Sequence, residues 1–250
     1  MTVYELYRNL NAAIPASLSC EWDNDGLMCC PDGSREVNRA LVCLDVTSDT
    51  IKAATDGKYD VIISHHPFIF KGLKSLDEND FIPKRVINLI KEGISVMSFH
   101  TRLDALEGGV NDSLCALLGI KNATEFGEGI GRIGTLDADA DLLCFAKKVK
   151  DTLGAPTLKI ADAKKKVSKV AVLGGSGKDE LFAAVAAGAD TFVSGELGHH
   201  TLTDAPDLGI NLIEAGHFHT EDHICHVLCG MLREYGIDAD YYNSNNIQVI

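Results

Sequence analysis

Residues 61–70 read Val-Ile-Ile-Ser-His-His-Pro-Phe-Ile-Phe, a β-branched run that ends in two adjacent histidines and a proline. The run at 61–63 predicts a strand buried on both faces, which is typical of a parallel sheet. Ligands of open parallel sheets bind beyond the carboxyl ends of the strands, where His65 and His66 lie. Because Pro67 disfavours the α conformation for His66, we expect an extended backbone and two diverging imidazoles. Such a pair suits two metal ions, or one ion and a second contact; the alternative is two ordinary loop histidines.

Strands and helices alternate along most of the chain. Strands are predicted at residues 39–44, 61–63, 94–99, 133–136, 167–173, 191–193 and 211–213. Helices are predicted at residues 3–14, 48–55, 81–91, 110–118, 141–153, 181–187 and 222–235, with an irregular segment at 20–33. This alternation indicates βαβ units, and therefore an α/β fold with mostly parallel sheets.

The chain contains an internal repeat. A shift of 130 residues lays residues 37–64 over 167–194 without a gap, and seven of the 28 positions are identical. The identical pairs are Val37/Val167, Val42/Val172, Asp49/Asp179, Ala53/Ala183, Ala54/Ala184, Asp60/Asp190 and Ser64/Ser194. Two unrelated βαβ units could share part of this pattern, but duplication explains it better. We therefore predict two similar α/β halves, residues 1–125 and 126–250, which meet in a glycine-rich segment.

Composition excludes several classes of protein. Of the 250 residues, 46% are hydrophobic and 24% are charged, as in ordinary globular proteins. No apolar run approaches the roughly 18 residues of a membrane helix, and the beginning of the sequence lacks the features of a signal peptide. The eight cysteines form no C-x-x-C motif, so we expect reduced thiols and a cytoplasmic location. A net charge of -13 argues against a general nucleic-acid surface.

Histidines follow three of the predicted strands, and two of them precede a carboxylate by four residues. These residues are His65 and His66, His100 with Asp104, and His217 with Glu221. A shift near 117 residues aligns the two histidine–carboxylate pairs with each other. Imidazole with carboxylate suits zinc, iron, manganese or nickel. Four histidines and two carboxylates exceed the needs of one catalytic ion and suit two divalent ions about 3.5–4 Å apart.

Two ions against two carboxylates give the site a net positive charge within an acidic protein. Such a site attracts anionic substrates such as phosphates and lowers the pKa of bound water. Other histidines are left open as ligands, namely His199, His200, His219 and His223. The run Gly174-Gly175-Ser176-Gly177 fits neither phosphate-binding glycine motif, so we interpret it as a tight strand-to-helix turn.

Motifs along the whole chain carry a resemblance to a known family. They are Trp22-Asp23-Asn24-Asp25-Gly26-Leu27, Leu44-Asp45-Val46-Thr47, Ser64-His65-His66-Pro67, His100-Thr101-Arg102-Leu103-Asp104, Gly131-Arg132-Ile133-Gly134, Ser194-Gly195-Glu196 and Gly216-His217 with Glu221. The chain resembles the GTP cyclohydrolase 1 type 2 homologues, also called the NGG-interacting-factor-three-like family. That family usually has Thr-Gly-Glu where this chain has Ser194-Gly195-Glu196, a departure that keeps the hydroxyl.

The resemblance implies two α/β domains, a dinuclear metal centre in the cleft between them, and a ring-shaped homohexamer. By motif match the ligands are His65, His66, Asp104, His217 and Glu221, with Glu221 as the bridge between the ions. His100 is then close enough to bind metal or to transfer a proton.

These features predict a metal-dependent hydrolase for a nucleotide or another phosphate-bearing substrate. Water between two ions would attack an electrophilic carbon or phosphorus, and for GTP the attack is at C8 of the purine. His100 is the predicted proton-transfer group, because its ordinary pKa lies near operating pH. Some members of the family are described as interaction or regulatory proteins. The alternative is therefore a non-enzymatic metal-binding scaffold.

Glu196 is a further candidate, on the basis of the repeat. The 130-residue shift places it opposite His66, at the end of the strand predicted for 191–193. There it would orient a ligating histidine or accept a proton from the attacking water. The alternative is that Glu196 begins the following helix, where an acidic residue is favourable.

Overall fold

The computed structural model describes residues 1–250, which form two compact units. Unit 1 consists of Met1–Leu103 and Ile224–Asn246, and unit 2 of Asp104–His223 and Ile247–Ile250. The chain therefore leaves unit 1 after Leu103 and returns to it at Ile224, whereas a single boundary was expected near residue 125. That expected boundary falls inside a hairpin, because β5 (Lys121–Phe126) pairs with β6 (Gly131–Ala140). No helix has the length and apolar character needed to cross a membrane.

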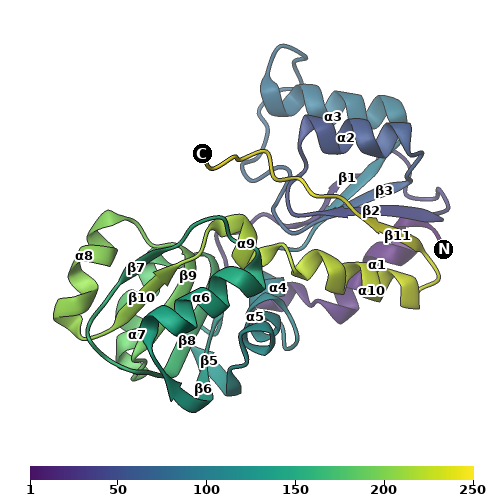
Figure 1. Cartoon of the computed structure of the whole chain (residues 1–250). Helices are drawn as coiled ribbons and strands as arrows, with labels where there is room; N and C mark the ends of the chain where they lie inside the picture. Colours follow the sequence, from purple (N-terminus) through teal and green to yellow (C-terminus); the bar gives the residue numbers. More distant parts are fainter. The chain divides into compact units, whose positions relative to one another are not determined.

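Unit 1 is a five-stranded sheet with helices on both faces (Figure 1). The strand order is β1 (Gly26–Cys29), β4 (Ser95–Ser98), β3 (Val61–Ser64), β2 (Arg39–Cys43) and β11 (Asp238–Tyr241). Only β1 is antiparallel to its neighbour. Helices α2 (Ser48–Asp56) and α3 (Phe81–Glu92) cover one face, and α1 (Val3–Ala13) and α10 (Ile224–Glu234) cover the other.

Local sequence sets the ends of these helices. Helix α1 begins with a capping box, in which Thr2 accepts from the backbone N–H of Glu5 and the Glu5 side chain accepts from the N–H of Thr2. The threonines Thr47 and Thr50 begin α2 in the same reciprocal way. Helix α3 ends at Gly93, whose φ of 69° is a left-handed conformation that glycine adopts at no steric cost.

Unit 2 is a six-stranded sheet, also covered on both faces. The strand order is β5, β6, β8 (Val167–Ser176), β9 (Thr191–Glu196), β10 (Asn211–Glu214) and β7 (Lys159–Ala161). Helices α5 (Val110–Leu118) and α6 (Leu142–Leu153) share one apolar core with the sheet, and α7 (Leu181–Ala186) and α8 (His199–Leu208) share the other. Two short helices, α4 (Thr101–Ala105) and α9 (His217–Glu221), follow β4 and β10.

The two sheets contain the same three-strand motif. In unit 1, Ala40 pairs with Val61; in unit 2, Val170 pairs with Thr191, which are the same two positions shifted by 130 residues. The pairings of β3 with β4 and of β9 with β10 also have equivalent registers. The predicted α/β class with two similar halves is therefore confirmed.

Strand direction is more mixed than the expected mostly parallel arrangement. Unit 1 fits that expectation, but in unit 2 only the β8–β9 and β9–β10 pairs are parallel. The remaining pairs of unit 2 are antiparallel, because the β5–β6 hairpin and the short strand β7 flank the repeated motif on its two sides. In each unit, candidate residues lie at the carboxyl ends of parallel strands, which are β3 and β4 in unit 1 and β9 and β10 in unit 2.

Candidate metal centre

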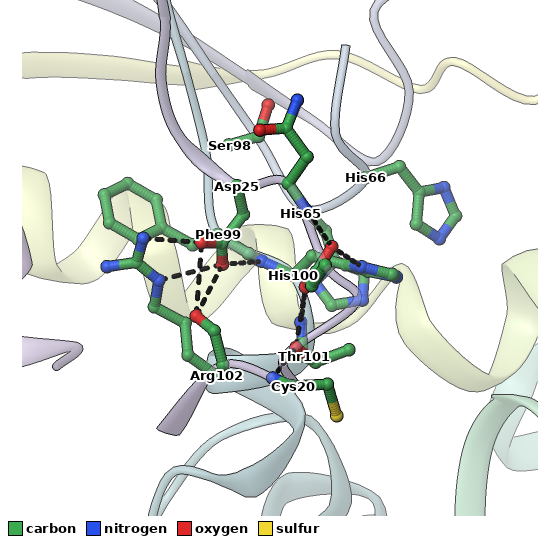
Figure 2. Close-up of polar contacts among 12 residues, drawn as sticks. Cys20, Asp25, His65, His66, Ser98, Phe99, His100, Thr101 and Arg102 are labelled. Atoms are coloured by element: carbon green, nitrogen blue, oxygen red, sulfur yellow. Dashed lines mark hydrogen bonds and ion pairs between the residues drawn. The ribbon is translucent and has the colours of Figure 1, made fainter. Parts of the chain in front are cut away.

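Three histidines of unit 1 lie together at the ends of β3 and β4. One potential ligand atom from each of His65, His66 and His100 lies within 4.8 Å of the others. The imidazole of His65 is buried, and its centroid is 5.1 Å from that of His66 and 5.4 Å from that of His100. The expected divergence of His65 and His66 is therefore not observed, because the chain bends at both residues instead of continuing the strand. Figure 2 shows these residues beside Phe99, Thr101 and Arg102.

Each of the three imidazoles directs Nδ1 toward an oxygen that can only accept a hydrogen bond. His65 Nδ1 donates to the carbonyl of Phe99 at 2.9 Å. His66 Nδ1 donates to Asp45 Oδ1 at 2.8 Å, and His100 Nδ1 donates to Asp23 Oδ1 at 3.0 Å. Because Nδ1 carries the proton in each neutral ring, Nε2 keeps its lone pair. This is the tautomer that a metal-ligating histidine needs, and a carboxylate or carbonyl behind the ring is its usual partner.

The carboxylate of Asp23 is held ionised behind His100. It accepts hydrogen bonds from the Thr101 backbone N–H at 3.1 Å and from the Thr101 hydroxyl at 2.6 Å. Burial alone would raise the pKa of Asp23, but the hydrogen bonds from His100 and Thr101 lower that pKa to about 2. A negative charge at this position favours the proton on Nδ1 of His100 and fixes the orientation of the ring.

A buried ion pair fixes the backbone on the other side of His100. Arg102 donates to both carboxylate oxygens of Asp25, from Nε at 2.8 Å and from Nη2 at 2.6 Å, and both side chains are almost fully buried. Its Nη1 donates to the side chain of Asn11 and to the carbonyl of Ile14. Asp25 also accepts from the backbone N–H of His100. Dashed lines in Figure 2 mark several of these contacts, which hold the histidine in a defined position.

In unit 2, His217 lies between two carboxylates. Its Nε2 is 3.1 Å from Glu221 Oε2, one turn along α9, and its Nδ1 is 3.4 Å from Glu196 Oε1. Glu221 is buried, whereas the Glu196 side chain is 61% exposed. Two ligand atoms about 2.1 Å from one ion lie roughly 3.0–3.4 Å apart for cis-octahedral or tetrahedral angles. His217 and Glu221 therefore have the spacing of ligands to one ion.

Glycines allow α9 to approach the sheet at this site. A Cβ atom on Gly175, whose φ is 64°, would lie 2.1 Å from Glu221 Oε1. The N–H of Gly175 donates to the Thr220 hydroxyl at 3.1 Å. The glycine run at 174–177 was expected to be a strand-to-helix turn; it lies mostly within β8, which continues to Ser176. Its role is to make space for the carboxylate of Glu221.

Asp104 lies beside Glu221 in unit 2, and the remaining histidines have other surroundings. Asp104 is buried on α4, one of its carboxylate oxygens lies within 4.8 Å of one of Glu221, and its backbone carbonyl accepts from the side chain of Asn111 at 3.3 Å. His223 donates from Nε2 to the carbonyl of Val110 at 3.0 Å, a contact within unit 2. His199 and His200 lie exposed at the beginning of α8, with their rings 5.6 Å apart. The ring of His219 packs edge-on against Phe218.

Sequence reasoning gave no separate role to the acceptors Asp23 and Asp45. Both lie in motifs that supported the family resemblance, but nothing in their spacing links Asp23 to His100 or Asp45 to His66. The contacts join residues 77 and 21 positions apart and depend on the order of strands in the sheet. Glu196 ends β9, three residues before α8, so it does not begin that helix.

Comparison with known proteins gives consistent matches over the whole chain. The model of the family described as Duf34/NIF3 (NGG1p interacting factor 3) matches residues 1–247. A Clostridium perfringens protein named GTP cyclohydrolase 1 type 2 homolog is 30% identical over 88% of this chain and 87% of its own length. The Nostoc protein of the same name is 34% identical over 87% and 84%. The Protein NIF3 homolog of Schizosaccharomyces pombe is 30% identical over 89% and 87%.

Solved structures show the same fold. A hypothetical protein of Staphylococcus aureus aligns with a TM-score of 0.88 at 27% identity and covers 100% of this chain and 99% of its own. Reduced HcgD from Methanocaldococcus jannaschii aligns with a TM-score of 0.85 at 25% identity, over 96% and 97% of the two chains. The architecture of the duplicated α/β units is therefore shared with these proteins.

Proposed function

The chain belongs to the Duf34/NIF3 family, and on this basis we propose that it is a dinuclear metal-dependent hydrolase of a nucleotide or another phosphate-bearing substrate. The observation that carries the proposal is the common orientation of His65, His66 and His100. All three present Nε2 as a lone-pair donor, while Nδ1 donates to a fixed oxygen. Ordinary surface histidines have no reason to share this arrangement.

The two units supply complementary ligand types. Unit 1 offers imidazole nitrogen, and unit 2 offers the buried carboxylates Asp104 and Glu221 together with His217. Nitrogen ligands alone leave the charge of two divalent ions uncompensated, and the carboxylates reduce it. We therefore assign His65, His66, Asp104, His217 and Glu221 as ligands of two ions, with Glu221 as the bridge. Zinc, iron, manganese or nickel suits this mixed set.

Bound divalent ions supply a water of lowered pKa and stabilise negative charge that develops on the substrate. The protein's own side chains orient the ligating histidines and accept the proton. His100 accepts a proton at Nε2, and Asp23 stabilises the resulting imidazolium through its contact with Nδ1. Glu196 orients His217 from the opposite nitrogen, as Asp45 does for His66.

A metal-loaded activity screen tests the proposal. The protein, purified without chelator, is assayed with each of the four metals against nucleotides and simple phosphate esters. We expect metal-dependent turnover that is lost in His65→Ala. The matched control is His226→Ala, because His226 contacts the ring of Tyr241 and lies outside the ligand set. Tight binding of two ions without turnover of any substrate would favour a metal-binding scaffold instead.

We also propose a homohexamer in the cytoplasm, as the family resemblance implies. Light scattering should then give a particle mass roughly six times the 26.9 kDa of the chain. A monomer or dimer at micromolar concentration would contradict the hexamer without affecting the assignment of ligands.

A further inference from the structure

Two large aromatic side chains remain exposed beside the histidines of unit 1. Trp22 is the only tryptophan of the chain and is 63% exposed, and Phe70 is 48% exposed. Burying such side chains is among the most favourable steps in folding, so their exposure leaves a large apolar surface in contact with water. Neither side chain belongs to the apolar core of the sheet.

The two rings form an open corner against His100. Their centroids are 6.2 Å apart and the rings are inclined by 60°. The imidazole of His100 lies 6.1 Å from Trp22 and 6.4 Å from Phe70, edge-on in both cases. The corner therefore contacts His100, the residue that we assign to proton transfer. Because Trp22 is 63% exposed and only its neighbours Phe70 and His100 meet it edge-on, part of its ring is accessible to a planar group.

The loops that carry the corner are tied to each other and to the site. The side chain of Asn24 donates to the carbonyl of Ile69, which joins the loop of Trp22 to that of Phe70. On either side of Asn24, Asp23 holds His100 and Asp25 holds Arg102. A surface formed in advance in this way loses little conformational freedom when a ligand binds.

We propose that Trp22 and Phe70 bind the planar heteroaromatic ring of the substrate, with the ring stacked on Trp22 and its edge toward Phe70. This inference rests on the proposed function and specifies its substrate class: a compound with both a heteroaromatic ring and a phosphate or similar anionic group. Aromatic side chains stack on any nucleobase, because every base has a π-face. The corner recognises the presence of a ring, and other contacts determine which base is preferred.

Trp22 is its own probe, since no other tryptophan contributes to the fluorescence. The metal-loaded protein is titrated with GTP, ATP and UTP, and with tripolyphosphate, which has the charge but no ring. We expect at least one nucleotide to change the Trp22 emission saturably and to bind more tightly than tripolyphosphate. If no nucleotide binds more tightly than tripolyphosphate, the inference is overturned.

Variants of both aromatic residues complete the test by calorimetry. Trp22→Leu should weaken nucleotide binding roughly 5- to 150-fold, the range expected for loss of one base stack, and leave tripolyphosphate binding and metal content unchanged. Trp22→Phe should restore part of the affinity, and Phe70→Leu should have a smaller effect. The control is Phe81→Leu, because Phe81 is 67% exposed in the same unit but contacts Arg85.

Unchanged nucleotide affinity in Trp22→Leu would overturn the assignment of the ring site. The proposed function is judged separately. Metal-dependent turnover together with unchanged nucleotide affinity in Trp22→Leu would leave the hydrolase proposal standing and exclude the ring site. Nucleotide binding that depends on Trp22, without turnover of any substrate, would leave the ring site standing and exclude the hydrolase.

Discussion

The two units use nearly the same backbone for different chemistry. In unit 1 the strand β3 is followed by His65 and His66, whereas the equivalent strand β9 ends in Gly195 and Glu196. The pairing of these strands with their neighbours keeps the same register in both units. The duplicated parts are those that fix the backbone, and the divergent parts are the residues just beyond the strands. Strand ends can change function without loss of the fold, because their side chains are not needed for the core.

An aspartate that binds the backbone at the beginning of the preceding strand is also common to both units. Asp60 accepts from the backbone N–H groups of Asn38 and Arg39, and Asp190 accepts from those of Ser168 and Lys169, the same positions shifted by 130 residues. Each aspartate joins the beginning of one strand to that of the next. The difference is in the further partner, because only Asp60 also binds an arginine, Arg35 at 2.8 Å.

The largest expected effect comes from shortening the chain. A protein of residues 1–223 lacks β11, which pairs with β2, and α10, which covers one face of the unit 1 sheet. All strands of unit 2 remain. We expect amide hydrogen exchange in β2 and β3 to lose most of its protection, while β8 and β9 stay protected. A chain of residues 1–246 is the control; full protection of β2 in the shorter chain would contradict the division into units.

Single ligand substitutions in the two units come next. His65→Ala removes a proposed nitrogen ligand from unit 1, and His217→Ala removes a proposed one from unit 2. We expect two ions per wild-type chain by elemental analysis. Each variant should lower metal affinity by more than the roughly 100-fold limit typical of indirect contacts. A wild-type content near one ion that His217→Ala leaves unchanged would refute the two-ion site.

The acceptors behind the histidines should have intermediate effects. Asp45→Asn and Glu196→Gln keep the shape of the side chain and remove the charge that faces His66 or His217. We expect metal affinity to fall roughly 10- to 100-fold in each case. Because Asp77 is exposed and its carboxylate accepts hydrogen bonds from Asn79, far from any histidine in sequence, Asp77→Asn provides a matched control. Normal metal affinity in Glu196→Gln would remove Glu196 from the site.

The smallest effect is expected at the shared aspartate. Burial alone would raise the pKa of Asp60, but hydrogen bonds from Asn38, Arg39 and Arg35 lower it. Asp60 therefore stabilises the fold above about pH 4, and this contribution is lost as the pH falls through the lower pKa of the folded state. Asp60→Asn should reduce the free energy of unfolding by about 1–3 kcal/mol at pH 7.

Urea unfolding of wild type and Asp60→Asn at pH 7 and pH 3 measures this difference, which should shrink at the lower pH. Asp190→Asn is the paired variant, and it should cost less, because the Asp190 carboxylate has a hydroxyl partner, Thr191, where Asp60 has Arg35. A larger loss for Asp190→Asn would show that the arginine does not distinguish the two sites.

Periodicity in the sequence predicted most of the elements that bury apolar residues, but it missed β1, which lies in the segment at 20–33 that was expected to be irregular, and it missed exposed strands. The helix at 110–118 and the strand at 61–63 are close to their observed bounds, because their buried faces require a regular pattern. Strand β5 was missed, since five of its six residues are exposed. Strand β11 was missed because it reads Asp-Ala-Asp-Tyr and is specified by its partner β2.

The same distinction applies to the site. Spacing selected the histidines and the carboxylate Glu221 as candidates, because all follow strands or lie one helical turn apart. It could not identify Asp23 and Asp45 as acceptors, since those contacts depend on neighbouring loops. The expected divergence of His65 and His66 assumed that the strand continues, whereas a bend brings the two rings together.

The discontinuity of unit 1 has a consequence for the synthesis of the protein. The ribosome synthesises residues 1–103 well before α10 and β11, which complete that unit. At about 5–20 residues per second, roughly 7–30 seconds separate the two parts, long enough for the continuous segment of unit 2 to fold first. During this interval the edge of β2 has no partner and is open to pairing with other nascent chains. Chaperones that bind exposed strand edges should therefore matter most for the first-made unit.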